Sequence, residues 1–309
     1  MSEKQPIAFL SGEMVPLADA KISIMTHAFL YGTACFEGIR GYWSQEEGQL
    51  FLFRLKEHYE RLKNSGKITM IPISYSVQEL CDITTEICRR SEFDGDIYIR
   101  PVAYKSGEGI GVKLTGIPND FLVFAIPFGN YVDVNKGLRV QVSSWTHVED
   151  NAIPMRAKIN GAYINAAYAK SEALDNGFDE AIFLDKNGLV SEGSAENFFM
   201  IRDGKLITPG VSQHILEGIT RASIIELARE ELGIEVVERS INRSELYVCD
   251  EAFVCGTGAQ VAPITEIDRR VVGDGKIGPI SRRLQNLYFD VVRGKVDKYR
   301  SWCAPVYKD

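Results

Sequence analysis

Two dipeptides near the middle of the chain, Asn187-Gly188 and Asp203-Gly204, limit the possible folds more than any other feature. Both pairs readily adopt the left-handed backbone of a two-residue β-hairpin turn, and each separates two short apolar runs. The runs cover residues 181–185, 189–191, 197–202 and 206–208. We therefore expect an antiparallel meander over residues 181–208.

Short strands and a few amphipathic helices are predicted on both sides of this stretch. The expected strands are 7–10, 34–42, 49–53, 96–105, 120–127, 138–145, 234–239, 251–256 and 260–267, and the expected helices are 56–67, 77–90, 162–174, 220–231 and 280–293. Apolar residues recur at helical or alternating spacing in these segments. The pattern predicts an α+β protein with mainly antiparallel sheets.

Residues 128–137 lose this periodicity and contain Gly129, Asn130 and Asn135, which is typical of a connection between domains. The sequence thus predicts a small N-terminal α+β domain (1–127), an interdomain loop (128–137) and a large, barrel-like C-terminal α+β domain (138–309). A βαβ dinucleotide fold is disfavoured, because the glycines of residues 107–111 lead into Lys113-Leu114-Thr115-Gly116 rather than into a helix.

Charge and composition exclude several classes of function. The net charge of −7 and the absence of a Lys/Arg-rich stripe disfavour nucleic acid as a partner. No apolar run is long enough for a signal peptide or a membrane span, so we expect a cytoplasmic protein without membrane contact. The six cysteines form no CxxC pair and the four histidines show no metal-ligand spacing, so no metal site is expected.

Three segments offer the groups that pyridoxal 5′-phosphate (PLP) requires from a protein. Lys158 lies among small and apolar residues just before a predicted helix, and could supply a neutral amine. Glu192 follows a hairpin turn among small residues and could hold a protonated ring nitrogen. Gly218-Ile219-Thr220-Arg221 opens a helix, where amides and a hydroxyl suit a phosphate.

Each of these groups also has a plain structural interpretation. Lys158 fits a surface lysine, Glu192 and Glu196 fit solvated loop acids, and Thr220 fits an ordinary helix N-cap. Arg61, which could supply charge to the phosphate, fits an ordinary helical arginine.

Further candidates are an amide-rich turn and a pair of polar residues on an apolar strand. The turn is Gly256-Thr257-Gly258, and the pair is Tyr98 and Arg100, which should point to one face of their strand. Arg100 there needs an anion or a paired acid, or else forms a surface salt bridge. The remaining aromatic candidates, each also suited to a core or an interface, are Tyr31, Phe36, Phe128, Tyr131 and Tyr163.

The sequence resembles the branched-chain aminotransferases of the fold-type IV PLP enzymes along almost its whole length. The matching pieces are HAFLYGTACFEGIR (27–40), EHYERL (57–62), YIRP (98–101), AKINGAY (157–163), SEGSAEN (191–197), GITR (218–221) and the Gly256-Thr257 pair. The resemblance implies the D-amino-acid aminotransferase-like architecture and a homo-oligomer, with a dimer as the minimal unit and a hexamer as the larger possibility.

The resemblance also implies a role for each matching residue. Lys158 binds the cofactor covalently and moves the α-proton, and Glu192 pairs with the ring nitrogen. The phosphate ligands would be Arg61, Ile219, Thr220 and Thr257, while Tyr163 supports the ring oxygen and Leu216 packs on the ring. The substrate residues would be Phe36, Tyr98, Arg100, Tyr131, Tyr163, Gly256 and Gly258, with Tyr31 and the loop from Ile110 to Val112 supplied by the partner subunit.

The implied reaction moves an amino group between Leu, Ile or Val and 2-oxoglutarate by a ping-pong mechanism. Aromatic walls would take the branched side chain, and Arg100 would take the distal carboxylate of glutamate.

Two departures from the family leave the substrate preference open. Ala162 stands where many relatives have Asn, and Gly258 where many have Ala, which leaves room for broader specificity towards aromatic or (R)-amine substrates. Three competing functions are a D-amino-acid transaminase, an aminodeoxychorismate lyase and a non-enzymatic PLP carrier. Residues 107–112 disfavour the first because they lack Arg and His, and Tyr98 and Arg100 disfavour the second.

Overall fold

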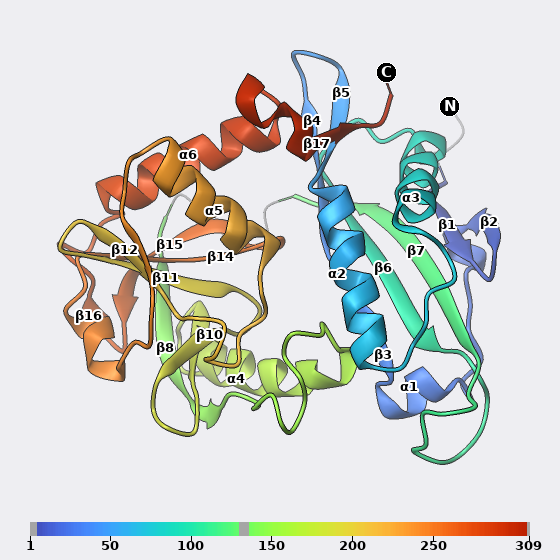
Figure 1. The fold of residues 1–309 in the computed structure, drawn as a ribbon. Helices are drawn as coiled ribbons and strands as arrows, with labels where there is room; N and C mark the ends of the chain where they lie inside the picture. Colours follow the sequence, from blue (N-terminus) through green and yellow to red (C-terminus); the bar gives the residue numbers. More distant parts are fainter. Residues whose placement is uncertain (1–4, 130–135, 308–309) are drawn as a thin grey trace. The chain divides into compact units, whose positions relative to one another are not determined.

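The computed structural model describes residues 5–129 and 136–307. The chain forms two compact units (Figure 1): unit 1 contains Met1–Gly129, Ala157–Gly161 and Asp290–Asp309, and unit 2 contains Asn130–Arg156 and Ala162–Phe289. The units are not contiguous in sequence, because residues 157–161 and 290–309 belong to unit 1 although they follow the start of unit 2. The predicted domain boundaries stay a prediction, and residues 130–135 of the predicted interdomain loop lie outside the described residues.

Unit 1 is built on one antiparallel sheet with the strand order β17-β5-β4-β6-β7-β1-β2, in which β3 also pairs with β6. The strands are β1 (Ile7–Leu10), β2 (Glu13–Pro16), β3 (Ala34–Phe36), β4 (Ile39–Ser44), β5 (Gln49–Phe53), β6 (Ile97–Lys105), β7 (Asn119–Pro127) and β17 (Cys303–Pro305). The helices are η1 (Leu17–Asp19), α1 (His27–Tyr31), α2 (Leu55–Ile68), α3 (Val77–Ser91) and η4 (Asp297–Trp302).

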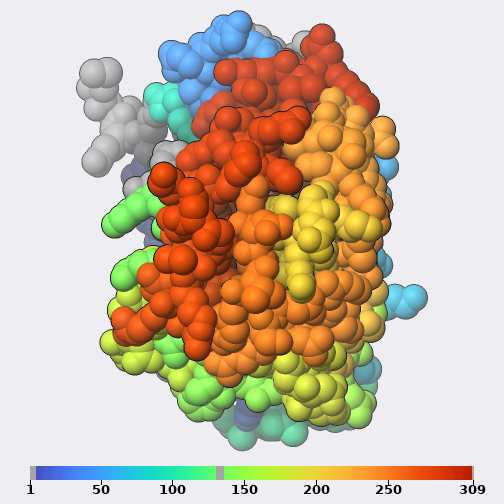
Figure 2. Space-filling model, turned by 90° about the vertical axis from the view of Figure 1, so that its left-hand side faces the viewer, coloured from blue at the N-terminus to red at the C-terminus, as the bar shows by residue number. Residues whose placement is uncertain are grey.

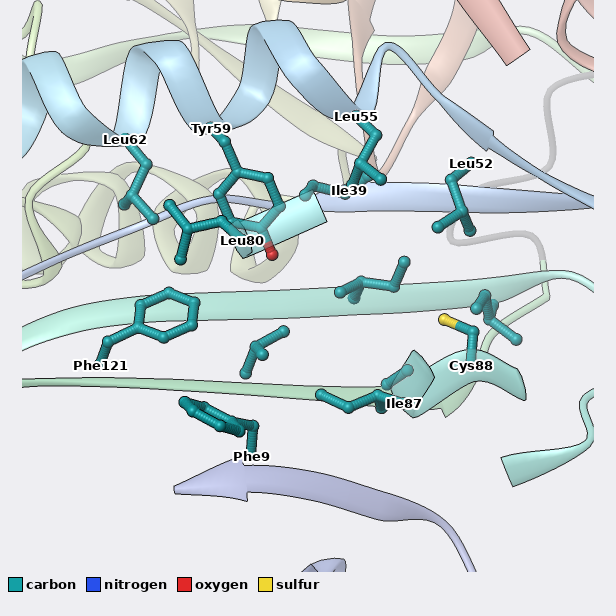
Figure 3. Packing of buried hydrophobic residues seen from close by; sticks show 14 of the residues in the cluster. Phe9, Ile39, Leu52, Leu55, Tyr59, Leu62, Leu80, Ile87, Cys88 and Phe121 are labelled. Carbon is teal, nitrogen blue, oxygen red and sulfur yellow. The ribbon is translucent and has the colours of Figure 1, made fainter. Parts of the chain in front are cut away.

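The core of unit 1 lies between this sheet and helices α2 and α3. Figure 3 shows Leu55, Tyr59 and Leu62 of α2 facing strand residues, and Leu80 and Ile87 of α3 belong to the same buried cluster. The apolar residues of each helix recur every three or four positions, which places them on one face. Each fully buried Leu or Ile contributes about 1.5 to 3 kcal/mol to folding, so the cluster fixes α2 firmly.

Unit 2 is built on a second sheet with the strand order β10-β9-β8-β15-β14-β11-β12-β13, and β16 pairs with β15. The strands are β8 (Leu138–Thr146), β9 (Glu180–Leu184), β10 (Val190–Gly193), β11 (Asn197–Arg202), β12 (Lys205–Thr208), β13 (Val236–Glu238), β14 (Glu251–Gly256), β15 (Gln260–Ile267) and β16 (Arg270–Val271). The helices are α4 (Tyr163–Asp175), α5 (Ile219–Glu230) and η3 (Arg243–Tyr247), while η2 (Asn160–Ala162) and α6 (Pro279–Val292) include residues of both units.

Both faces of the unit 2 sheet are covered. Ala169 and Ala173 of α4 pack with Ala181 and Phe183 of β9, whereas Ile182 points into the larger core on the opposite face. In the space-filling view of Figure 2, orange segments of unit 2 form a large part of the surface that faces the viewer. The sheet is mainly antiparallel, although β8 pairs in parallel with β9 and β15, and β12 with β13.

The prediction of one meander over residues 181–208 was wrong. Both hairpins form, because β9 pairs with β10 and β11 with β12. However, β10 ends the strand order, and β11 pairs with β14 rather than with β10. The hairpin dipeptides specify only the two turns that contain them, whereas the partner of β11 lies beyond residues 203–250.

The other predicted elements are present, most of them within two residues of the predicted ends. The predicted strand 34–42 is broken into β3 and β4 around Glu37, whose amide donates to the Pro101 carbonyl oxygen. The elements β2, β16, β17, α1 and the 3-10 helices were not predicted. Residues 106–116 are irregular, and no helix in residues 5–129 and 136–307 is long and apolar enough to cross a membrane.

Candidate active site

Lys158 belongs to a short segment that adds to unit 1 beside β3. Its carbonyl oxygen accepts a hydrogen bond from the Phe36 amide at 2.9 Å, and its own amide donates to the Ser65 hydroxyl of α2 at 3.2 Å. The partly buried side chain places Nζ 5.1 Å from the centre of the Phe36 ring. The backbone of Lys158 is therefore fixed to two elements of the unit 1 core, unlike that of a lysine in a surface loop.

Arg100 lies against the same aromatic ring. Its guanidinium carbon is 4.2 Å from the centre of the Phe36 ring, and its Nε and Nη2 donate to the Tyr98 hydroxyl at 3.1 and 2.7 Å. The prediction that Tyr98 and Arg100 share one face of β6 is confirmed. Among the residues that the structure describes, no carboxylate forms an ion pair with Arg100, so the surface salt bridge is excluded there. Lys158, Phe36, Tyr98 and Arg100 thus form one cluster.

Arg61 is held by a fully buried carboxylate. Its Nε and Nη2 donate to the two oxygens of Glu37, each at 2.7 Å, and Nδ1 of His58 lies 2.7 Å from Glu37 Oε2. Burial would raise the pKa of Glu37, but the charge and hydrogen bonds of Arg61 and His58 outweigh it and lower the pKa to about 2. Arg61 is therefore not an ordinary exposed helical arginine.

Tyr31 and the loop from Ile110 to Val112 lie together at α1 of unit 1. The Tyr31 hydroxyl accepts from the Gly111 amide at 2.9 Å, and Nε2 of His27 lies 2.8 Å from the Gly111 carbonyl oxygen. Ile110 and Val112 are 81% and 78% exposed. Tyr131, the remaining substrate candidate of the first half of the chain, lies outside the described residues.

Glu192 in β10 of unit 2 is buried, so the interpretation as a solvated loop acid was wrong. Its Oε2 accepts from the Asn197 side-chain amide and from the Leu216 backbone amide, both at 3.1 Å, and its Oε1 lies 3.3 Å from Nε2 of His147. Glu196 is also buried, and desolvation together with the Glu180 carboxylate raises its pKa to about 8. Glu192 is thus oriented by contacts on both oxygens.

The start of α5 lies next to this carboxylate. Gly218 is the N-cap residue, Ile219 begins the helix, and no side chain caps the first amides, so the interpretation of Thr220 as the N-cap was wrong. A Cβ on Gly218 would come within 2.0 Å of Asn197 Oδ1, so only glycine fits here. Asn197 also donates to the Leu216 carbonyl oxygen at 2.9 Å and thereby joins Leu216, Glu192 and the helix start.

The remaining candidates of unit 2 lie at the ends of elements. Gly256 is the last residue of β14, and Thr257 and Gly258 lie in the turn that follows it. A Cβ on Gly256 would lie 3.4 Å from the Ala195 carbonyl oxygen. Tyr163 is the first residue of α4. The end of β14 at Gly256 therefore lies against the loop that follows Glu192.

Comparison with known proteins identifies the family. The family model for class IV amino-transferases matches residues 34–267. The chain belongs to the class IV aminotransferases. The probable branched-chain-amino-acid aminotransferase of Aquifex aeolicus is 52% identical over 97% of this chain and 96% of that protein.

Two solved structures extend this finding to the fold. The branched-chain aminotransferase of Thermoproteus uzoniensis with norvaline has a TM-score of 0.94 and 43% identity, over 98% of this chain and 100% of that chain. The branched-chain amino acid aminotransferase of Thermobaculum terrenum in its PLP form has a TM-score of 0.94 and 38% identity, over 99% and 100%. This class IV aminotransferase therefore has the predicted fold-type IV, α+β architecture.

Sequence reasoning missed several residues that hold the candidates in place. Glu37 and His58 position Arg61, and Asn197 and His147 contact Glu192. The spacing of His58 and Arg61, three apart on a predicted helix, was the available signal for a shared partner. Among the described residues, no group of three or more His, Cys, Asp or Glu side chains could hold a metal ion.

Proposed function

We propose that this aminotransferase uses PLP to move the amino group between branched-chain L-amino acids and 2-oxoglutarate in a ping-pong reaction. The observation that carries the proposal is the cluster in which the Lys158 amine and the Arg100 guanidinium both face the Phe36 ring. It combines a base, an apolar aromatic surface and a cation for a second carboxylate. The near full-length similarity to proteins named for branched-chain substrates supports the same choice.

The residues of each unit fit the requirements of PLP. In unit 1, Lys158 supplies an amine on a fixed backbone and Arg61 supplies an oriented guanidinium. In unit 2, the oriented Glu192 carboxylate suits a protonated ring nitrogen, and the uncapped amides at Ile219 and Thr220 suit a phosphate. We propose that Thr257 adds a phosphate contact, that Tyr163 supports the ring oxygen, and that Leu216 packs on the ring.

Two residues of the chain would then divide the proton chemistry. Lys158 would bind the cofactor covalently and, once displaced by the amino acid, would take the α-proton and return it to a different carbon. Glu192 would keep a proton on the ring nitrogen. PLP, when bound, supplies the conjugated system that takes up the electrons left by the α-proton.

Arg100 and the aromatic residues would set the substrate range. The Phe36 and Tyr98 rings would receive the side chain of leucine, isoleucine or valine, and Arg100 would bind the distal carboxylate of glutamate. We propose that Tyr131, Gly256 and Gly258 complete this set. Since both amino acids use the same residues, one product must leave before the second substrate binds, which gives ping-pong kinetics.

We also propose a homo-oligomer with a dimer as the minimal unit. Seven large exposed apolar side chains of unit 1 fall in two segments, Ile22, Ile24, Met25, Phe29 and Leu30 in one and Ile110 and Val112 in the other, and the Gly109 amide of the second segment donates to the Met25 carbonyl oxygen at 3.4 Å. Such a concentration is typical of a protein interface, and Tyr31 hydrogen bonds to the loop that carries two of its members. A Phe29→Asp variant should fall to the monomer mass in light scattering, and an unchanged mass would argue against this surface.

The division into domains at 1–127 and 138–309 and a cytoplasmic location are proposals of the same kind. Limited proteolysis between residues 128 and 137 would test the first. Cell fractionation would test the second.

Single-turnover absorbance of the bound cofactor tests the function directly. L-leucine, L-isoleucine, L-valine and L-glutamate should each change the spectrum, while D-alanine and an (R)-amine should not. A Lys158→Arg variant is the matched control, because it keeps a cation but removes the amine. A response to D-alanine or the amine that exceeds the response to L-leucine would overturn the proposed specificity.

A further inference from the structure

Glu37, His58 and Arg61 form a buried cluster. The function proposed above gives no role to the Glu37 carboxylate. His58 and Arg61 lie three residues apart on α2, so both point to Glu37 in the short connection between β3 and β4. The Glu37 side chain is completely buried, and the Arg61 side chain is 14% exposed. Each of the three contacts between these side chains measures 2.7 Å.

The charge state of this cluster follows from its contacts. The lowered pKa of Glu37 keeps the carboxylate ionised, and burial lowers the pKa of His58 against the opposing effect of Glu37. A neutral His58 must therefore carry its proton on Nδ1, the atom that faces the carboxylate. The charges of Glu37 and Arg61 then cancel, so the cluster carries no net charge. It is stabilised by the short, well-aligned hydrogen bonds between the three side chains.

The geometry also fixes the direction of the arginine. A guanidinium is planar, so two bonds through Nε and Nη2 fix the position of Nη1 as well. Glu37 is itself held through its backbone, because its amide donates to the Pro101 carbonyl oxygen at 2.9 Å. Glu37 is thus bonded to α2 through its side chain and to β6, next to Arg100, through its backbone.

We propose that Glu37 is a positioning residue for the cofactor phosphate, which it serves by orienting Arg61. The inference rests on the proposed function, in which Arg61 binds that phosphate. Glu37 touches neither substrate nor cofactor in this assignment. Its removal should therefore weaken the binding of a phosphorylated cofactor much more than the binding of the same ring without phosphate.

The test compares the affinities of the apoprotein for PLP and for pyridoxal, which lacks the phosphate. We expect Glu37→Gln to weaken PLP binding about ten- to a hundred-fold, as loss of a group that orients a ligand typically does. Pyridoxal binding should change less than about threefold, since the amide offers Arg61 one acceptor instead of two but leaves the rest of unit 1 in place. Equal loss for both compounds would mean that Glu37 is merely structural and would overturn the inference.

Two further variants keep the test valid if Glu37→Gln folds poorly. Glu37→Asp keeps the charge but shortens the side chain, and should give an intermediate loss that is again confined to PLP. In Glu37→Gln/Arg61→Gln both buried charges are removed, which proteins often tolerate. The ratio of PLP affinity to pyridoxal affinity in this double variant should equal the ratio in Arg61→Gln, because Glu37 acts only through Arg61. A lower ratio in the double variant than in Arg61→Gln would contradict this.

A matched control comes from another arginine pair of unit 1. Asp96 accepts hydrogen bonds from Arg293 at 3.0 and 3.3 Å, and Asp96→Asn breaks this pair without touching the cluster. We expect the ratio to remain at the wild-type value in this variant. Wild-type apoprotein that binds no PLP would refute the proposed function itself, whereas normal wild-type binding with an unchanged ratio in Glu37→Gln would refute only the role of Glu37.

Discussion

Replacement of Arg100 by leucine tests the dual-substrate proposal without disturbing the cofactor. The guanidinium donates two hydrogen bonds to the Tyr98 hydroxyl and lies 4.2 Å from the centre of the Phe36 ring. Leucine keeps an apolar side chain over Phe36 but offers nothing to the distal carboxylate of glutamate. One charge-assisted interaction in a partly buried position is worth about 2 to 4 kcal/mol once the unpaired carboxylate is included.

This energy converts into a loss of about 30- to 1000-fold in kcat/KM for the glutamate half-reaction. The leucine half-reaction should change by less than about fivefold, because in the proposed binding mode the leucine side chain contacts the aromatic rings and not the guanidinium. Single-turnover rates with each amino acid give the comparison, and circular dichroism checks folding.

Tyr98→Phe is the matched control for this experiment. It removes the hydroxyl that accepts from Arg100 but keeps both the ring and the guanidinium. The glutamate reaction should therefore fall less than in Arg100→Leu. Equal losses for glutamate and leucine in Arg100→Leu would refute the reasoning, because Arg100 would then bind the shared α-carboxylate or support the fold.

Three other predictions concern the cofactor and the buried carboxylates. Borohydride reduction of the purified protein followed by peptide mapping should place the pyridoxyl group on Lys158, and its discovery on another lysine would remove that assignment. Glu192→Gln should keep PLP bound but lower the transamination rate at least about a hundredfold, because a neutral amide cannot keep the ring nitrogen protonated; a rate within a few-fold of wild type would contradict it. The pKa of Glu37 falls from 4.5 to about 2 on folding, so this carboxylate stabilises the protein above pH 4.5 by about 3 kcal/mol, and that contribution is lost as the pH falls through 2. The free energy of unfolding measured in urea should accordingly fall more steeply between pH 4.5 and 2 in wild type than in Glu37→Gln. Parallel plots of this free energy against pH would exclude Glu37 as a source of acid sensitivity.

The sequence predicted those parts of the fold that depend on local interactions. The bounds of β1, β5, β11, β14 and β15 agree with the predicted strands, because alternation of side chains and turn residues act over a few positions. The partner of β11 could not be predicted in this way. Its pairing with β14 depends on which apolar faces fit together in the folded core, and residues 203–250 separate the two strands.

The candidate site shows the same division between local and distant information. Lys158, Glu192 and the start of α5 could be selected because their residue types and immediate neighbours suit PLP. Glu37 could not, since an acid within an apolar run reveals nothing about its partners until α2 brings His58 and Arg61 to it.

Each unit holds one of the two candidate carboxylates with hydrogen-bond donors from its own residues. Glu37 accepts from His58 and Arg61 within unit 1, and Glu192 accepts from Asn197 and the Leu216 amide within unit 2. A buried carboxylate without such donors would be protonated or would destabilise its unit by several kcal/mol. Because the donors belong to the chain itself, neither carboxylate needs a ligand to remain buried and oriented. Cofactor binding then does not have to order these groups. More of its free energy remains available to stabilise the transition state relative to the ground state, which is what accelerates a reaction.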